Sequence, residues 1–378
     1  MREGVHDIQR STLERLWHKH IAWYDWFLWL PLTPLAIIYA SAMAVRAGFW
    51  RFLGMRRRIR KVRVISVGNL TVGGNGKTPF TLFIARALRK RGLAVGIVSR
   101  GYRGQKGGSE AVLVSDGREL KLGPADAGDE PVMMAKSFDG PIAIARRRSD
   151  GIKLLQRLGR LDAVVLDDAF QHISLRRDCD LVLVNYERGL GNGWSLPAGP
   201  MRERLGAVRR ATAIALMSSS HGEECGLSER ELEKIGRSKT VGAVLRTGGL
   251  VQSVNGRWHE YPLAPFNSRR IVAVSGLADP IGFYTMIREL DAELVGVLEY
   301  PDHYVYDNAD WQEITRVARD ADMIITTEKD LVKLEQFPFP KDFLYALRLE
   351  ISLGSNEQRL VDAAMGIRGE PMPLASRA

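Results

Sequence analysis

Short apolar runs alternate along this chain with stretches whose apolar positions recur at helical spacing. The first run, Val62–Val67, is rich in β-branched residues, and a helical pattern follows over Phe80–Arg91. Further runs of strand length occupy residues 94–99, 112–114, 142–145, 163–166, 181–184 and 213–217. Strands that alternate with helices predict a parallel sheet with helices on both faces. Ligands of such a sheet bind at the carboxyl ends of its strands.

The pattern changes near residue 240. Two short apolar runs, Val241–Arg246 and Leu250–Val254, are separated by Thr-Gly-Gly and predict a small hairpin. A second strand–helix series follows, with strands expected at residues 271–275, 294–298, 323–327 and 343–347. At 378 residues the chain has room for two domains. We therefore expect an N-terminal segment over residues 1–55, a larger α/β domain over 56–240, and a smaller α/β domain over 241–378 that is entered through the hairpin.

No charged residue occurs between Trp26 and Val45, a stretch long enough to cross a bilayer core of about 30 Å. Tryptophans lie near its ends, at positions 17, 23, 26, 29 and 50, as in an interfacial aromatic belt. A single span fits this stretch. A helix lying in the membrane surface or a broken helical hairpin also fits, because Pro31 and Pro34 interrupt the helical pattern. A buried core helix is the alternative without a membrane.

Composition is ordinary for a folded protein, at 45% hydrophobic and 26% charged residues, which excludes wholesale disorder. The net charge of +10 is concentrated in residues 46–63, which hold no acidic residue. Such a basic block binds nucleic acid or anionic lipid. Its apolar, Trp-rich neighbour favours an anionic membrane surface, and we expect no nucleic-acid partner. Cys179 and Cys225 form no metal-ligand or disulfide pattern, which fits a reducing compartment.

The segment between the first strand and the first helix predicts a phosphate-binding loop. Its glycines let backbone N–H groups surround phosphate oxygens, Lys77 is expected to reach the β- and γ-phosphates, and the Thr78 hydroxyl is expected to bind Mg²⁺. The pattern departs at its first position, where Thr71 replaces glycine. The predicted nucleotide contacts are Thr71, Val72, Gly73, Gly74, Asn75, Gly76, Lys77 and Thr78.

An apolar strand ending in Asp167-Asp168 predicts the second half of a nucleotide site, because carboxylates at a strand end hold Mg²⁺ beside the phosphates. Other motifs are weaker by themselves. Asp129 precedes a helical stretch with proline in its first turn, so composition alone favours a helix N-cap. Asp302-His303 is a surface turn or a proton relay, and Arg202-Glu203 lies in a loop that is either solvated or near phosphate and metal. Residues 327–330, Thr-Glu-Lys-Asp, are similarly ambiguous.

Taken together, these motifs resemble one family. The set is Ser-Val-Gly-Asn-Leu-Thr-Val-Gly-Gly-Asn-Gly-Lys-Thr-Pro (66–79), Ser-Arg-Gly-Tyr (99–102), Gly-Asp-Glu-Pro (128–131), Asp-Asp-Ala-Phe-Gln-His (167–172), Leu-Pro-Ala-Gly-Pro-Met-Arg-Glu (196–203), Pro-Asp-His-Tyr (301–304) and Thr-Glu-Lys-Asp (327–330). In this order they strongly resemble the tetraacyldisaccharide 4'-kinases of lipid A synthesis in Gram-negative bacteria.

The resemblance implies an ATP- and Mg²⁺-dependent kinase that phosphorylates the 4'-hydroxyl of a tetraacyldisaccharide 1-phosphate to give lipid IVA. It implies a phosphate-loop α/β fold whose N-terminal helix associates with the cytoplasmic face of the inner membrane. It also implies roles for individual residues: Asp129 as general base with His303 as its partner, Lys77 at the phosphates, and a metal near Thr78, Asp167, Asp168 and Glu203. Gln171, His172 and Arg202 fall on further motif positions of the family.

Two other classes of function remain as alternatives. A membrane-bound nucleoside triphosphatase switch would need the phosphate loop but not Asp129 or His303, and the chain lacks a clear Asn/Thr-Lys-x-Asp guanine-reading motif. A nucleic-acid-binding ATPase would use the basic block of residues 46–63. The apolar, Trp-rich segment beside that block argues against this class. The sequence gives no indication of oligomeric state.

Overall fold

The structure is a computed structural model that describes residues 16–17, 26–52, 56–74, 76–101, 104, 110–219, 225–236, 239–263 and 266–367. Its strands are β1 (Arg63–Asn69), β2 (Val95–Ser99), β3 (Val112–Ser115), β4 (Ile142–Ile144), β5 (Ala163–Leu166), β6 (Cys179–Asn185), β7 (Ala213–Ser219), β8 (Thr240–Val254), β9 (Arg257–Pro262), β10 (Arg270–Ser275), β11 (Glu293–Glu299), β12 (Met323–Thr327) and β13 (Leu344–Ser352).

The helices are α2 (Trp26–Trp29), α3 (Leu32–Phe52), α4 (Lys77–Lys90), α5 (Pro124–Ala127), α6 (Asp129–Ser137), α7 (Arg148–Leu158), α8 (Glu229–Ile235), α9 (Ile281–Arg288), α10 (Asn308–Val317), α11 (Glu328–Leu334) and α12 (Glu357–Met365). Short 3₁₀ turns lie at Leu205–Arg210 and Gly354–Asn356.

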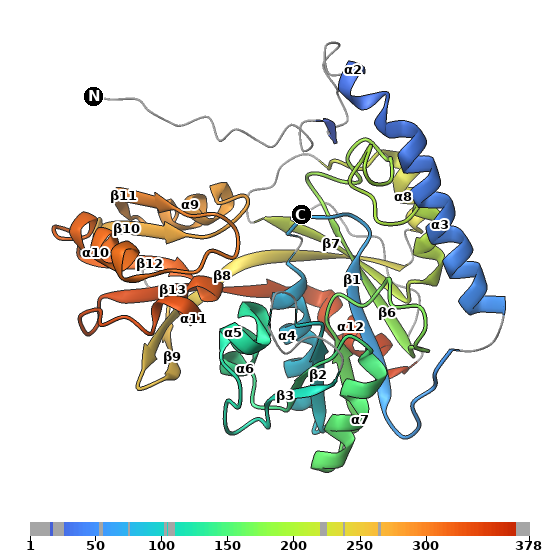
Figure 1. Cartoon of the computed structure of the whole chain (residues 1–378), viewed down its shortest axis with the longest axis horizontal. Coiled ribbons are helices and arrows are strands. Elements are labelled where there is room, and N and C mark those ends of the chain that lie inside the picture. The colour runs from blue at the N-terminus through green and yellow to red at the C-terminus, as the bar shows by residue number, and fades with distance from the viewer. Residues whose placement is uncertain are drawn as a thin grey trace.

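One mixed sheet runs through the described part of the chain (Figure 1). Its strand order is β11-β10-β12-β13-β8-β7-β6-β1-β5-β2-β4-β3, with β9 beside β8. Neighbouring strands in the run β2-β5-β1-β6-β7 pair in parallel. Neighbouring strands in the run β11-β10-β12 also pair in parallel. The predicted α/β fold with two strand–helix series is therefore confirmed.

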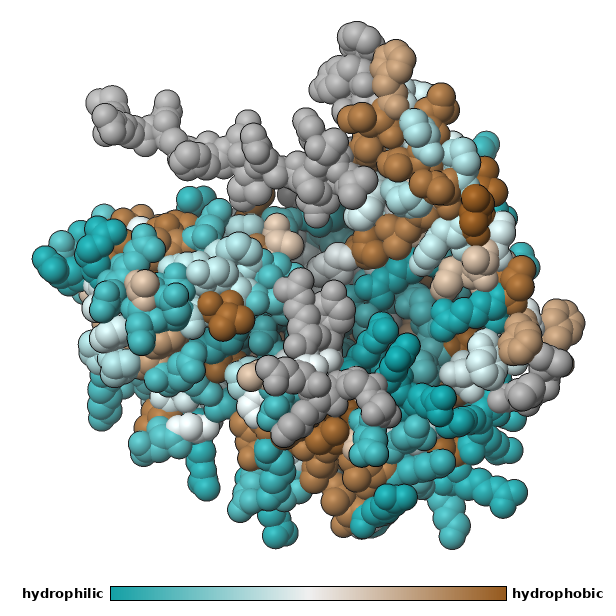
Figure 2. Space-filling model, in the orientation of Figure 1, coloured by the Kyte–Doolittle hydropathy of each residue, from teal (hydrophilic) through white to brown (hydrophobic). Residues whose placement is uncertain are grey.

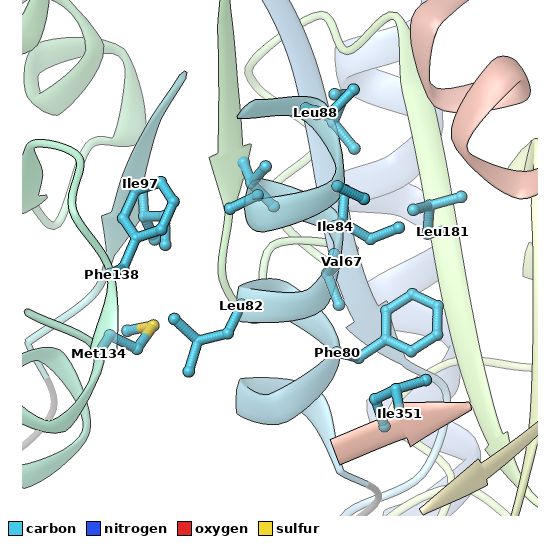
Figure 3. Packing of buried hydrophobic residues seen from close by; sticks show 14 of the residues in the cluster. Val67, Phe80, Leu82, Ile84, Leu88, Ile97, Met134, Phe138, Leu181 and Ile351 are labelled. Atoms are coloured by element: carbon cyan, nitrogen blue, oxygen red, sulfur yellow. The ribbon is translucent and has the colours of Figure 1, made fainter. Parts of the chain in front are cut away.

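Helices cover both faces of the sheet because successive strand residues point to opposite sides. On β1, Val64 packs in the same cluster as Ile152 of α7, whereas Ile65 packs with Ile84 of α4. Strands buried on both faces produce the continuous apolar runs seen in the sequence. Figure 3 shows the α4 side of this core, where Phe80 and Ile84 lie against Val67 of the sheet. The first helix after the phosphate loop is thus held in a closely packed interior.

The predicted hairpin over residues 241–254 is wrong, because these residues form the single strand β8. The Thr-Gly-Gly segment is instead a bulge: Arg348 of β13 pairs with Gly249 and Leu349 pairs with Thr247, so Gly248 has no partner. A Cβ on Gly248 would lie 2.2 Å from the Glu350 side chain, which explains the glycine. β8 pairs parallel with β7 and antiparallel with β13, so it joins the two series. The domain limits at 55 and 240 stay a prediction.

The helix α3 lies on the outside of the molecule. It contains a 19-residue stretch, Leu32–Trp50, that is long and apolar enough to cross a membrane, and only 11% of its most apolar window is buried. The side chains of Ile38 and Val45 are 65% and 72% exposed, and Figure 2 shows this apolar band along α3. Ala36 and Ala40 face inward. The alternative of a buried core helix is therefore wrong.

Candidate active site

The phosphate loop follows β1 and ends where α4 begins at Lys77. Gly76 caps α4 with φ 67°, a left-handed conformation that favours glycine. Gly73 and Gly74 are exposed, and a Cβ added to either would meet no described atom within 4 Å, so the backbone there faces open space. The neighbouring segment anchors the loop, because the Val72 N–H donates to the Pro200 carbonyl at 2.8 Å. Asn75 lies outside the described residues.

The side chains of Lys77 and Thr78 are at the base of this loop. The Lys77 ammonium lies 3.4 Å from the Gly73 carbonyl oxygen, folded over the loop as an anion-binding lysine would be. Burial lowers the pKa of Lys77, and the charge of Asp168 opposes that shift. Thr78 is buried, 6% exposed, in the first turn of α4.

Asp167 and Asp168 follow β5 and sit in different electrostatic environments. The carboxylate of Asp167 accepts hydrogen bonds from Thr81 Oγ1 at 3.1 Å and Ser99 Oγ at 3.2 Å. Burial raises the pKa of Asp167 to about 6, helped by the charges of Glu130 and Asp168. Burial also acts to raise the pKa of Asp168, but Lys77 and Arg202 outweigh it and lower that pKa.

Arg202 and Glu203 lie side by side in sequence but bind different partners. Nη1 of Arg202 donates to both oxygens of Asp168, at 2.9 and 3.0 Å. Both oxygens of the buried Glu203 accept from the Arg210 guanidinium, each at 2.9 Å. The structure thus brings Arg202 to the aspartate pair and holds Glu203 in an ion pair with Arg210.

Asp129 and His303 meet although 174 positions separate them in the sequence. His303 Nδ1 lies 3.2 Å from Asp129 Oδ2, and the Lys333 ammonium lies 3.5 Å from the same oxygen. Burial acts to raise the pKa of Asp129, but the hydrogen bond from His303 and the charge of Lys333 lower it. Asp129 is the first residue of α6, whose N-cap is Gly128 without a side-chain cap bond. The helix N-cap interpretation of Asp129 is therefore wrong.

Comparisons with known proteins agree on one family. A family model described as tetraacyldisaccharide-1-P 4'-kinase matches residues 28–365. The tetraacyldisaccharide 4'-kinase of Pelobacter propionicus is 37% identical over 80% of this chain and 82% of its own length. That of Geobacter sulfurreducens is 38% identical over 79% of this chain and 82% of its own. The chain belongs to the tetraacyldisaccharide 4'-kinase family.

A solved member of that family has the same fold. The crystal structure of LpxK from Aquifex aeolicus in complex with ATP aligns with a TM-score of 0.71 and 28% identity, covering 90% of this chain and 99% of that one. ATP binding is thus supported for the 4'-kinase fold, and family membership favours a kinase over the nucleoside triphosphatase switch.

Gln171 and His172, which the resemblance predicts as site residues, follow the aspartate turn. Gln171 Nε2 donates to the Asn69 carbonyl at 2.9 Å, which ties the turn to the end of β1. Arg46 of α3 donates to the Gln171 carbonyl at 3.2 Å. Burial lowers the pKa of His172 to about 4, and four guanidinium groups add to this shift. They belong to Arg148, Arg177, Arg46 and Arg100.

Several residues of this 4'-kinase site were not predicted. Thr81 and Ser99 hold Asp167, and Arg148 donates to the Asp167 carbonyl at 3.0 Å. Thr81 lies one helical turn after Thr78, a spacing that signals a shared face once the helix is known. Lys333 follows Lys329 at the same kind of spacing, four residues on. Arg148 carries no motif, and its position depends on the tertiary fold.

Proposed function

We propose that this chain transfers the γ-phosphate of ATP to the 4'-hydroxyl of a tetraacyldisaccharide 1-phosphate, giving lipid IVA. Family membership supports this substrate class. The observation that carries the proposal is the Asp129–His303 pair, in which a carboxylate of the first strand–helix series meets an imidazole of the second. A switch that only hydrolyses a nucleotide has no use for such a base aimed at an acceptor.

The residues of the phosphate loop fit ATP with Mg²⁺. Exposed loop glycines and the Lys77 ammonium offer donors to phosphate oxygens. Mg²⁺ takes hard oxygen ligands, usually one or two carboxylates beside phosphates and water. The Thr78 hydroxyl and the Asp167–Asp168 pair are such a donor set, and when bound the cation would neutralise charge on the transferred phosphate.

Glu203 is proposed as a further oxygen ligand near that cation. Arg210 occupies both of its carboxylate oxygens. A metal at Glu203 would therefore share the carboxylate with Arg210 or displace that guanidinium. Among the described residues, no three His, Cys, Asp or Glu side chains are arranged to hold a metal by themselves, which fits a cation that arrives with its nucleotide.

Asp129 acts as the general base in this proposal. One carboxylate oxygen of Asp129 takes the proton of the sugar 4'-hydroxyl. At the same time the oxygen of that hydroxyl attacks the γ-phosphorus. The bond from the γ-phosphorus to the bridging oxygen of the β-phosphate breaks, and ADP leaves. His303 hydrogen-bonds the other oxygen of Asp129 and stabilises the charge on the base. Phosphoryl transfer depends mainly on such positioning and charge neutralisation.

The outer face of α3 fits the lipid side of the reaction. Its apolar residues are exposed over a helix that packs its inner face on the catalytic half. We infer that α2 and α3 bind the cytoplasmic face of the inner membrane with this outer face among the acyl chains. The exposed Arg46 and Arg100 both place positive charge near His172, beside the aspartate turn, and are suited to the 1-phosphate of the lipid.

The test is transfer of labelled γ-phosphate to a tetraacyldisaccharide 1-phosphate in detergent micelles, with the wild-type chain and the Asp129→Ala variant side by side. Labelled lipid from the wild type alone supports both the kinase and its base. ATP hydrolysis without labelled lipid, equal in both proteins, overturns the proposal in favour of a nucleotide switch.

A further inference from the structure

The helix α11 presents two lysines to the start of α6. Thr327 caps α11, and its hydroxyl oxygen accepts from the Asp330 N–H at 3.1 Å. Lys329 and Lys333 lie one turn apart, so they share a helix face. Lys329 forms an ion pair with Glu130, and Lys333 forms one with Asp129. The Thr-Glu-Lys-Asp motif thus begins a helix whose two lysines contact Asp129 and Glu130 at the start of α6.

Lys333 is held in place from behind by a buried acid. Its ammonium lies 3.0 Å from Asp330 Oδ1 and 5.3 Å from the centre of the Tyr306 ring. Asp330 is 0% exposed, and its other oxygen accepts from the Gly276 N–H at 2.9 Å and the Thr327 hydroxyl at 2.7 Å. The ammonium of Lys333 is thus held between the buried Asp330 and Asp129.

The two side chains that reach Asp129 contact the same one of its oxygens. His303 Nδ1 and the Lys333 ammonium both approach Oδ2, at 3.2 and 3.5 Å. Within the described ranges, no hydrogen bond is made to Oδ1 of Asp129. Contacts to one oxygen restrict the rotation of the carboxylate, and the second oxygen is then the one left for the hydroxyl of the proposed acceptor.

We propose that Lys333, itself fixed by Asp330, is a positioning residue that orients Asp129 and keeps it ionised. This rests on the proposed role of Asp129 as general base. The other charged groups facing the pair are Asp302, whose Oδ2 lies 3.7 Å from His303 Nε2, and the Lys329–Glu130 ion pair beside it. Among these groups, Lys333 is the cation that is itself held by a buried acid.

A second buried ion pair across the same helices provides a matched control. Lys136, near the end of α6, lies 2.6 Å from Glu335, which follows α11. Lys136 is seven residues from Asp129, about two helical turns. A purely structural role of the α6–α11 ion pairs therefore predicts similar effects for Lys333→Met and Lys136→Met.

The experiment measures kcat and the KM for ATP of wild type, Lys333→Met and Lys136→Met on the micellar lipid, from about pH 8 to about pH 5. We expect Lys333→Met to lose kcat on the order of 10- to 100-fold with the KM for ATP unchanged. Its loss relative to wild type should grow as pH falls, because Asp129 without the Lys333 charge binds a proton more readily. Lys136→Met should keep a pH-independent ratio to wild type.

A Lys333→Met ratio that is constant with pH, or equal to that of Lys136→Met, overturns the inference. If Lys333→Met does not fold, the double variant Lys333→Met/Asp330→Asn removes the unpaired buried acid and gives the same measurement. Asp129→Asn separates the two claims. Full activity of Asp129→Asn contradicts the proposed base itself, whereas an inactive Asp129→Asn beside an unaffected Lys333→Met contradicts only the role of Lys333.

Discussion

The two acids on either side of the site differ in what surrounds them. On the phosphate side, Asp167 is buried beside other acids, which raises its pKa to about 6. On the acceptor side, Asp129 is also partly buried, which acts to raise its pKa, but the hydrogen bond from His303 and the charge of Lys333 lower it. Both of these side chains come from the other half of the sheet. The lowered pKa of Asp129 thus depends on contact between the halves, whereas the groups that act on Asp167 lie within the first half. In the proposed mechanism, the pair of Asp129 and His303 therefore exists only where both halves meet.

On the phosphate side, a large effect is expected at Lys77. Lys77→Met removes the cation at the loop and should lower phosphate transfer on the order of 10²- to 10³-fold, because charge developing on the phosphate loses a fixed partner. Single-turnover transfer at saturating ATP measures this loss, with Lys90→Met at the exposed end of the same helix as control. Activity close to wild type in Lys77→Met would contradict the assignment of this loop and its lysine to phosphate binding.

The contrast between the two acids also predicts stability. The folded pKa of Asp167, about 6, lies above its unfolded value, so the folded protein holds the extra proton and stability falls as pH rises through this window. Asp167→Asn should therefore raise the free energy of unfolding above about pH 6 by roughly 1–3 kcal/mol, and have little effect below about pH 4. Denaturant unfolding without nucleotide or divalent cation measures it. A stabilisation that is the same at both pH values would contradict the assigned burial effect.

A smaller effect is expected at the membrane. Ile38→Lys with Val45→Lys places two charges on the exposed face of α3 and should weaken binding to anionic vesicles on the order of tenfold or more. Leu158→Lys, at an exposed position on α7, is the control. Sedimentation with vesicles compares them. Equal binding of both variants would contradict the proposal that the exposed face of α3 binds the membrane.

Much of the fold is predictable because the strands of both series are buried runs with clear limits, such as Ala163–Leu166 and Met323–Thr327. The region near residue 248 is not, because a glycine pair indicates a turn by composition and only the Glu350 side chain opposite explains a bulge. The true hairpin joins β8 and β9 through Asn255-Gly256, both with positive φ, which is the usual sequence for a two-residue turn.

The site divides in the same way. The phosphate loop and the aspartate pair are local in sequence, so spacing alone predicts them. The meeting of Asp129 with His303 and Lys333 depends on how the two series pack, and no local pattern contains it. For that reason composition favoured a helix cap at Asp129, and only the resemblance to a family predicted the pair.

The most direct test of the account is a double-mutant cycle between the halves, using kcat for phosphate transfer of Asp129→Asn, His303→Ala and the double variant. Loss of a general base costs on the order of 10²- to 10⁴-fold, and we expect Asp129→Asn to fall in this range. If the pair acts as one unit, the double variant loses no more than Asp129→Asn alone. Losses that multiply would show that Asp129 and His303 act independently, and would contradict a base assembled across the sheet.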